Sequence, residues 1–600
     1  MTVSITELLR DASRSVPDHV ALREKEFGIW QETTYAEYWD LVSTVGMALW
    51  ALGVRPGDKV AIHSENRVAW IVTDLAAQGI QAASVGLYPT NPASEVEYLL
   101  GHSEAKVLIA EDQEQVDKAL RVKDRLPQLE RIVYVEPRGV RTYEDPILIS
   151  WNEFLEMGGS QRKETPELFD ELVDGIESDS TATIVYTSGT TGPPKGAMLS
   201  HENLLWTAQK AAEIISGDRA RQHVEYLSYL PLCHVFGRLY DILGAISMRA
   251  TVNFAESIDT LVSDLAEVQP TYFPAPPRIW EKMKATAEIK MADASFTKRS
   301  MYGLFMKAGL RNVDRRLTGR RLGPAGLLTQ ALGWLAVFRS LRKKIGMGRC
   351  RQAVSGAAPI APELLRFFMA LGVPIFEGWG MTETTSIGTV NPVDDVKLGT
   401  IGTPLDGVEM KLADDGEILV RHGGVFQGYF KNPEATDAAL EDGWLHTGDV
   451  GEWVGDHMRI IDRKKDIIIT AGGKNLSPSE IENKLKVSPY IKEALVIGDQ
   501  RRFVSALIGI EFDTVSNWAQ RRGITFTTYR DLSEKPETIE LIRKEVDRVN
   551  DDFARVEQIR EFRLLPKELD HDQGELTATQ KVKRRVVEEL FEELIEGMYA

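Results

Sequence analysis

Hydrophobic positions in residues 1–400 follow two alternating patterns. Short runs rich in aliphatic residues, such as Lys59–His63 and Thr181–Tyr186, predict strands. Longer stretches with apolar residues at helical spacing lie between such runs, and one of them begins at Ala69. Because strands that alternate with helices are typical of layered architectures, we expect a large α/β domain of stacked sheets and helices in this part of the chain.

The pattern changes after about residue 400. Val408–Leu412, Glu417–Arg421 and Arg459–Asp462 predict strands of a smaller β-rich subdomain. A compact α+β segment follows. We therefore expect a large N-terminal domain over residues 1–461 and a small α+β C-terminal domain over residues 467–600.

Two helices are predicted in the small domain. Ser477–Glu480 predicts the start of one, because it combines a capping box with a proline at the first helical position. Residues 586–595 predict an amphipathic helix that packs on the small domain. Its apolar face would contain Val587, Leu590, Phe591 and Leu594.

The composition describes a globular protein, with 43% hydrophobic and 27% charged residues over a length of 600. Single hydrophobic cores stop growing well below that length, so more than one domain is expected. Only Cys233 and Cys350 are cysteines, which offers no disulfide framework and fits a reducing cytoplasm. The amino terminus lacks the basic start and apolar core of a secretory signal, so we expect a cytoplasmic protein. A formal net charge of −18 argues against nucleic acid as the main partner.

Residues 284–349 depart from this acidic average, with 15 lysines and arginines against three acids. An uncharged run, Leu322–Phe338, lies inside this segment between Arg321 and Arg339. The run is short for a membrane span and contains Pro324, so we do not expect a spanning helix. Two interpretations stay open: an insertion that lies on an anionic membrane surface, or one that packs on the protein's own acidic surface.

The strongest local motif is Tyr186–Gly196, which reads Tyr-Thr-Ser-Gly-Thr-Thr-Gly-Pro-Pro-Lys-Gly. It follows a predicted strand and should therefore lie at a strand's carboxyl end, where α/β proteins bind ligands. Its glycines permit close approach of the backbone, its hydroxyl groups can donate hydrogen bonds and Lys195 supplies positive charge, so the loop suits polyphosphate. Proline at position 194 excludes a Walker loop. The predicted phosphate-binding residues are Thr187, Ser188, Gly189, Thr190, Thr191, Gly192 and Lys195.

This loop resembles the phosphate-binding signature of the adenylate-forming, or AMP-binding, superfamily, which includes the acyl-CoA synthetases. Further motifs of that superfamily follow in family order, at Gly356–Pro359, Glu377–Glu383, Trp444–Asp449 and Asp462–Asp466. The resemblance extends over nearly the whole chain. It implies a fatty acid:CoA ligase that uses ATP, Mg²⁺ and coenzyme A and forms an acyl-adenylate.

The resemblance also implies roles for single residues. Trp379 would stack on adenine, Thr382 would contact the α-phosphate and Glu383 would hold Mg²⁺. Asp449 would bind the ribose hydroxyls. Near the carboxyl terminus, Gly574–Arg584 resembles the family's last motif and makes Lys581 the catalytic lysine. The other implied nucleotide-binding residues are Gly356, Ala357, Ala358, Glu377, Gly378, Gly380, Arg463 and Lys474.

The acyl substrate is indicated by Leu230–Arg238, which resembles the version of this motif in bacterial long-chain fatty acyl-CoA synthetases. On this basis His234 is expected to be a catalytic and substrate-site residue, and Phe236 and Gly237 are expected to line the acyl site. Amino-acid-activating relatives carry an aspartate in this motif, and the present sequence has none. A purely structural histidine is the alternative for His234.

The resemblance implies two conformations. The small, mobile C-terminal domain would present Lys581 for adenylation and would then rotate about a hinge at residues 462–466, with Asp462 and Lys465 as pivot positions. Two other functions stay open: loading of a carrier protein with a fatty acyl group, and binding of nucleotide or fatty acid without catalysis. The oligomeric state is also open.

Overall fold

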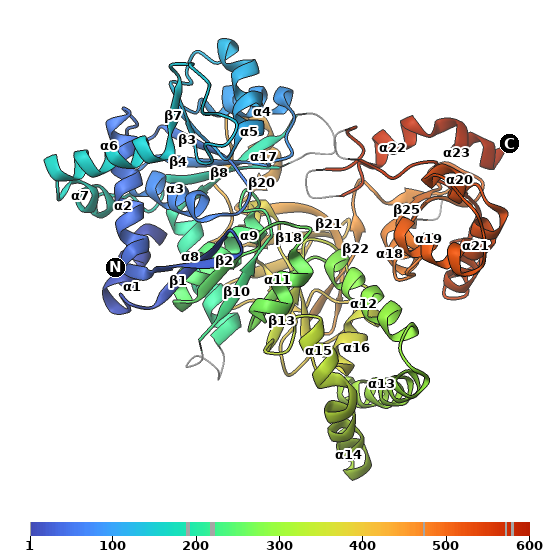
Figure 1. The fold of residues 1–600 in the computed structure, drawn as a ribbon. Coiled ribbons are helices and arrows are strands. Elements are labelled where there is room, and N and C mark those ends of the chain that lie inside the picture. Colours follow the sequence, from blue (N-terminus) through green and yellow to red (C-terminus); the bar gives the residue numbers. More distant parts are fainter. Residues whose placement is uncertain (1, 188–192, 217–222, 472–474, 571–572, 578–580) are drawn as a thin grey trace.

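The computed structural model describes residues 2–187, 193–216, 223–471, 475–570, 573–577 and 581–600. The chain forms a large body and a smaller C-terminal part that lies to one side of it, next to β21 and β22 (Figure 1). Within the described residues, the large body contains four sheets, and the small part contains a three-stranded sheet and a two-stranded one.

An eight-stranded sheet of order β19-β9-β8-β4-β3-β5-β6-β7 forms one layer of the large body. The sheet is parallel from β8 through β4, β3, β5 and β6 to β7. At its other end, β9 is antiparallel to β8, and β19 is antiparallel to β9. The run Lys59–His63 forms β3 as predicted, and its side chains from Val60 onward are buried because helices cover the sheet. The other strands are β4 (Ala83–Leu87), β5 (Val107–Ala110), β6 (Arg131–Tyr134), β7 (Leu148–Ser150), β8 (Thr181–Thr187), β9 (Lys195–Ser200) and β19 (Gly428–Tyr429).

Two further sheets place residues around the predicted site. In the order β12-β13-β14-β15-β16, the first three strands are parallel and the last two are antiparallel. A β-rich unit of order β17-β18-β21-β20, with β22 beside β21, follows in the chain. The strands are β12 (Tyr272–Ala275), β13 (Gln352–Ser355), β14 (Ile375–Trp379), β15 (Thr389–Val390), β16 (Thr403–Pro404), β17 (Glu409–Leu412), β18 (Glu417–Arg421), β20 (Leu440–Glu441), β21 (Trp444–Val454) and β22 (His457–Arg463).

A four-stranded sheet completes the large body, with β10 (Glu225–Ser228), β11 (Thr251–Phe254), β1 (Val20–Glu26) and β2 (Ile29–Thr34) in that order. The helices of the body outside residues 277–344 are α1 (Ile5–Ser15), α2 (Tyr35–Ala51), α3 (Val68–Gly79), α4 (Ala93–Ser103), α5 (Gln113–Val122), α6 (Trp151–Glu164), α7 (Leu168–Asp174), α8 (His201–Ser216), α9 (Val235–Arg238), α10 (Ala245–Met248), α11 (Leu261–Val268), α16 (Pro362–Ala370) and α17 (Pro433–Ala439).

The small part has hydrophobic clusters of its own, built on a sheet of order β25-β26-β27. Its α18 begins at Pro478, and the Ser477 hydroxyl accepts a hydrogen bond from the backbone of Glu480, which is one half of the predicted capping box. The elements are β23 (Ile468–Ile469), β24 (Asn475–Leu476), α18 (Pro478–Lys486), β25 (Ile491–Ile497), β26 (Val504–Ile510), α19 (Phe512–Arg521), α20 (Tyr529–Ser533), α21 (Pro536–Asn550), β27 (Ile559–Leu564), α22 (Arg584–Leu590) and α23 (Glu592–Tyr599).

The predicted carboxyl-terminal helix is wrong in one respect. The chain breaks at Phe591 into α22 and α23, and Leu590 is exposed instead of buried. Val587, Phe591 and Ile595 are buried at a spacing of four residues, so the apolar face follows that row and leaves Leu590 beside it.

The basic segment is helical and extends from the large body. It comprises α12 (Pro277–Ala292), α13 (Phe296–Leu317), α14 (Pro324–Gly333), a π-helical turn η4 (Trp334–Phe338) and α15 (Arg339–Lys344). Figure 1 shows α14 at the tip of this projection, far from the small part. Among the described residues, no helix is both long enough and apolar enough to cross a membrane.

Candidate active site

A cleft of about 1440 Å³ lies between the large body and the small part. It is lined by chain segments that are far apart in the sequence, as expected for a ligand site between domains. Every predicted site residue that the structure describes lines this cleft except Gly237. Ser188–Gly192 and Lys474 lie outside the described residues.

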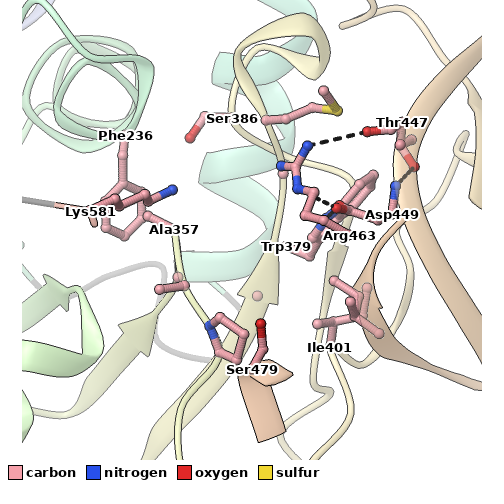
Figure 2. Close-up of a pocket in the computed structure, with 18 of the residues that line it drawn as sticks. Phe236, Ala357, Trp379, Ser386, Ile401, Thr447, Asp449, Arg463, Ser479 and Lys581 are labelled. Atoms are coloured by element: carbon pink, nitrogen blue, oxygen red, sulfur yellow. Dashed lines mark hydrogen bonds and ion pairs between the residues drawn. The ribbon is translucent and has the colours of Figure 1, made fainter. Parts of the chain in front are cut away.

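Trp379 and Asp449 meet on one wall of the cleft (Figure 2). The Trp379 indole nitrogen donates a hydrogen bond of 2.8 Å to Asp449 Oδ2. Arg463 lies opposite Asp449 in the antiparallel β21–β22 ladder, and its Nε lies 2.6 Å from Asp449 Oδ1. Burial raises the pKa of Asp449, and Arg463, Trp379 and Lys581 oppose that rise. The arrangement holds a buried carboxylate between Trp379 and Arg463 in the wall of the cleft.

The Glu383 side chain is held by a hydrogen bond from strand β19. Its Oε1 accepts a hydrogen bond of 2.6 Å from the Tyr429 hydroxyl, and burial together with Glu383 raises the pKa of Tyr429. Lys195 Nζ lies 5.1 Å from the centre of the Tyr429 ring. Tyr429 reaches this position because β19 pairs with β9, where Tyr429 is opposite Ala197. Sequence analysis did not identify Tyr429, since only this pairing brings it to the site.

His234 and Phe236 line the opposite side of the cleft. His234 precedes α9, and its Nδ1 accepts a hydrogen bond of 3.1 Å from the backbone of Phe236, so the neutral ring carries its hydrogen on Nε2. Burial and the nearby Lys581 lower the pKa of His234 to about 4, which keeps the ring neutral at pH 7. The Phe236 ring packs edge-on against Tyr240, at 5.5 Å between centres, and Tyr240 also lines the cleft.

Gly237 lies close to the backbone of the preceding turn. A Cβ atom at this position would lie 2.6 Å from the carbonyl oxygen of Pro231, so a side chain here would displace the backbone. Gly237 therefore permits the tight turn that presents His234 and Phe236 and does not itself line the cleft.

Glu377 brings a buried carboxyl group to the cleft. Burial raises its pKa to about 8, so the group is mostly protonated at pH 7. Ser355 is its neighbour on the parallel strand β13. Among the described residues, neither Glu377 Oε2 nor Ser355 Oγ has a hydrogen-bond partner. Buried polar atoms in proteins are nearly always paired, and Glu377 lines the cleft, so a polar ligand there would complete the hydrogen bonding of its carboxyl group.

Lys581 enters the cleft from the small part and lies near Phe236 and Ala357 (Figure 2). Its backbone is fixed by Thr577, which donates its N–H to the Lys581 carbonyl at 2.7 Å and accepts the Lys581 N–H on its hydroxyl at 3.0 Å. The side chain is open to the cleft, yet the surrounding protein and Arg463 lower its pKa to about 8, against the opposing effect of Asp449. At pH 7 most Lys581 side chains are thus positively charged.

The segment between the two parts is held by Asp462. Its carboxylate accepts hydrogen bonds from the Ser477 hydroxyl at 2.7 Å and from the backbone and hydroxyl of Ser479 at 3.1 and 2.9 Å. Lys465 lines the cleft, and burial lowers its pKa. Asp462 thus joins the end of β22 to the start of α18 in this arrangement.

The two parts also touch through α12. Arg278 Nη1 lies 3.1 Å from Glu493 Oε1 on β25, and Arg521 Nη2 lies 2.8 Å from Asp293 Oδ1 at the end of α12. Both ends of this helix are thus paired with the small part while Lys581 is in the cleft.

Comparisons with known proteins agree with this arrangement. The chain is 36% identical to the long-chain-fatty-acid–CoA ligase FadD15 of Mycobacterium bovis, over 99% of this chain and 97% of that protein. It is 31% identical to the long-chain-fatty-acid–CoA ligase ACSBG2 of Mus musculus, over 100% of this chain and 93% of that protein.

Solved structures show the same fold. The adenylation domain of a carboxylate reductase from Mycobacterium chelonae has a TM-score of 0.72 at 20% identity, over 99% of this chain and 91% of that one. The O-succinylbenzoate coenzyme A synthetase of Bacillus subtilis, solved with ATP and magnesium, has a TM-score of 0.64 at 21% identity, over 96% of this chain and 98% of that one. The predicted α/β domain with a separate C-terminal domain is confirmed.

The model of the AMP-binding enzyme family matches residues 9–430, and that of the AMP-binding enzyme C-terminal domain matches residues 465–600. The chain therefore belongs to the AMP-binding enzyme family, as the motifs predict.

Proposed function

We propose that this protein is an ATP-dependent long-chain fatty acid:CoA ligase that works through an acyl-adenylate and releases AMP and pyrophosphate. The observation that carries the proposal is the convergence of Lys581 with His234, Asp449 and Glu383 in one cleft, although Lys581 comes from the small part. The names of the relatives that match almost the full chain support the substrate class.

In the first step, a carboxylate oxygen of the fatty acid attacks the α-phosphorus of ATP. The bond from this phosphorus to the bridging oxygen breaks, and pyrophosphate leaves with the electron pair. Because negative charge shifts among phosphate oxygens, the protein contributes mainly by positioning and by electrostatic stabilisation. The Lys581 ammonium group supplies a cation between the acyl side, at Phe236, and the nucleotide side, at Asp449.

The nucleotide would lie along β14. Trp379 and the 356–358 turn would enclose the adenine, Asp449 would accept hydrogen bonds from the ribose hydroxyls, and Glu377 would meet a polar edge of the base. Thr382, Thr187 and Lys195 line the same cleft and would contact the phosphates, together with the loop 188–192. The backbones of Gly378 and Gly380 line the cleft between these groups.

Glu383 is the residue that would hold Mg²⁺. The donor set fits this ion, since Mg²⁺ prefers one or two carboxylates together with phosphate oxygens and water. The Tyr429 hydroxyl orients the carboxylate from one side. When bound, the ion would neutralise phosphate charge and so favour departure of pyrophosphate.

In the second step, the sulfur of coenzyme A attacks the acyl carbon, and AMP leaves. We propose that the domains are residues 1–461 and 467–600, and that the chain rotates about residues 462–466 between the steps, with Asp462 and Lys465 as pivots. The described arrangement would correspond to the adenylation state, and the position of Lys581 in the cleft supports this. Lys474 and its loop would serve the thioester-forming state.

The acyl side of the site is lined by Phe236 and Tyr240, with His234 at its junction with the nucleotide side. The neutral His234 ring suits an apolar chain better than a charged ring would. We further propose that the enzyme works in the cytoplasm and contacts anionic membranes, where long-chain fatty acids partition.

The test is pyrophosphate exchange into ATP with a panel of fatty, aromatic and amino acids. We expect exchange with long-chain fatty acids in the presence of Mg²⁺ and none with amino acids. Coenzyme A and a phosphopantetheinylated carrier protein are then compared as acceptors. Faster transfer to the carrier protein would favour the acyl-carrier alternative, and the absence of any exchange would favour a non-catalytic binding protein.

A further inference from the structure

Helix α14 has its glycines inside and its leucines outside. Gly326 and Gly333 are buried against α13. The Gly326 carbonyl accepts a hydrogen bond of 3.0 Å from Asn312 of α13. A Cβ atom on Gly333 would lie 3.2 Å from the side chain of Phe305, which is also on α13. On the opposite side, four leucines of α14 and η4 are 48–69% exposed. This leucine face consists of Leu327, Leu328, Leu332 and Leu335. A helix of a soluble protein normally buries its apolar side, so α14 is oriented the other way round.

Positive charge flanks the leucine face along the chain. Between Leu322 and Phe338 the sequence has no charged residue, and exposed cations lie on either side of that run. This basic border consists of Arg315, Arg316, Arg320, Arg321, Arg339, Lys343 and Lys344. Arg316 donates a hydrogen bond of 2.6 Å to Gln330, which ties the end of α13 to α14. None of these seven cations forms an ion pair with a carboxylate in the part of the chain that the structure describes. The second sequence-based interpretation, packing on the protein's own acidic surface, holds elsewhere in the segment, where Arg349 pairs with Glu225 of the large body.

The projection is fixed to the body at its base. Arg342 is buried and donates hydrogen bonds to the carbonyl groups of Met347, Cys350 and Gly372 at 2.7–3.0 Å. Its guanidinium also lies 5.1 Å from the Trp334 ring centre. These contacts hold η4 and α15 in place, so the leucine face is presented by a supported element.

The same projection is connected to the active-site cleft through α16. Arg366 on α16 pairs with Asp314 on α13 at 2.6 Å, and a Cβ on Gly309 of α13 would lie 3.2 Å from Ala370. The first turn of α16 supplies Pro362 and Glu363 to the lining of the cleft. One helix thus separates the projection from the cleft.

We propose that the leucine face and its basic border form the surface by which this enzyme lies on an anionic phospholipid membrane. The leucines would enter the boundary between headgroups and acyl chains, and the border cations would contact lipid phosphates. The choice of this partner rests on charge. A second copy of the chain would bring the same cations to the contact, whereas an anionic lipid surface complements them and also holds the apolar phase that leucines require. This surface rests on the membrane contact given under the proposed function, but its binding to lipid does not depend on the ligase activity.

The test is co-sedimentation of the full chain with vesicles of phosphatidylglycerol or of phosphatidylcholine, without substrates. We expect binding to the anionic vesicles that weakens between ~0.1 and ~1 M salt, because the Debye length falls from ~10 to ~3 Å. Changing Arg315, Arg316, Arg320 and Arg321 to Gln should lower the partition coefficient at ~0.1 M salt at least tenfold, since each basic residue near such a surface contributes to binding. Changing the four leucines to Gln should remove the binding that persists at high salt.

Two matched controls use exposed residues elsewhere. Changing Arg138, Arg530, Lys544 and Arg585 to Gln removes the same charge from side chains that are 69–76% exposed. Changing Phe27, Ile29, Ile258 and Val393 to Gln removes exposed apolar groups that are 63–88% exposed. Neither control should change binding by more than twofold. The far-UV circular dichroism spectrum should be unchanged in all four variants, which shows that they are folded.

Equal binding to both kinds of vesicle, or binding that neither the arginine variant nor the leucine variant reduces, would overturn the proposal. So would a dimer in lipid-free solution that the leucine variant dissociates, since the face would then be an interface between copies. Vesicle binding without any pyrophosphate exchange would refute the proposed function and leave the membrane surface standing.

Discussion

Replacing Lys581 with Ala should separate the two half-reactions. In the described arrangement this lysine is the residue of the small part that brings a positive charge to the junction of His234 and Asp449. We expect Lys581→Ala to reduce acyl-adenylate formation strongly and to leave thioester formation from supplied acyl-AMP nearly unchanged. The reason is that Lys581 would leave the cleft when the small part rotates.

The size of the effect follows from the position of the charge. Loss of a preorganised group at developing transition-state charge costs at least ~3 kcal/mol, which corresponds to about a hundredfold in rate. The pKa of about 8 adds a second signature. Only the protonated lysine supplies the cation, so kcat/KM for adenylation should fall above pH 8 and be about tenfold lower at pH 9 than at pH 7. Bound ATP stabilises the ammonium form, so the corresponding fall in kcat should occur at higher pH.

The assay is pyrophosphate exchange for adenylation and single-turnover thiolysis of synthetic acyl-AMP for the second step. Lys581→Arg is the matched control, since it keeps the charge and does not titrate below pH 12. The alkaline fall in kcat/KM should therefore disappear in this variant, whatever its absolute rate. Equal loss of both half-reactions in Lys581→Ala, or an unchanged alkaline fall in Lys581→Arg, would refute the assignment.

Three further variants test the site and the rotation. Lys465→Pro fixes φ near roughly −65° and should slow thiolysis at least tenfold more than adenylation. Equal rates of thiolysis in mutant and parent would place the hinge elsewhere. Asp449→Asn removes the charge that pairs with Arg463 and would bind the ribose. Because a hydrogen bond to a charged group contributes ~1.5–3 kcal/mol, KM for ATP in steady-state assays should rise at least tenfold. An unchanged KM would contradict the ribose-binding role. Arg278→Gln breaks the ion pair with Glu493. Because a partly exposed pair contributes up to ~1 kcal/mol, pyrophosphate exchange should fall about two- to fivefold while thiolysis stays unchanged. A loss in both steps would show that the pair serves only stability.

The fold and most of the site could be predicted because the signals are local. Strand β8 and its loop are contiguous in the sequence, as are the motifs around Trp379 and Asp449. Each segment carries its own glycines, hydroxyls or carboxylates, and the resemblance supplies their order. The structure then places these segments around one cleft.

Contacts that depend on strand register could not be predicted. Tyr429 reaches Glu383 only because a two-residue strand pairs with β9, and Arg463 meets Asp449 only because the two are opposite in β21 and β22. Neither pairing leaves a periodic signal in the sequence. The close approach of Gly237 to the carbonyl group of Pro231 could not be predicted either, since the motif does not show what a glycine packs against.

Helical periodicity was also an incomplete guide to burial. It places Leu590 on the apolar face of the last helix, where the chain instead breaks at Phe591. In α14 the apolar residues are the exposed ones, because the glycines pack more closely against α13 than leucines could. The hydrophobic pattern shows which residues favour burial, but it does not show which surface, if any, covers them.

The separate hydrophobic clusters of the small part have a consequence for thermal unfolding. Its buried residues, such as Ile508 and Val546, pack among themselves, and the contacts with α12 are ion pairs. The loss of one core therefore does not require the loss of the other. Such a chain does not meet the two-state condition, so a single melting temperature describes neither part. A nucleotide bound in the shared cleft would bring the two transitions closer together, by favouring the form in which both parts are folded and in contact.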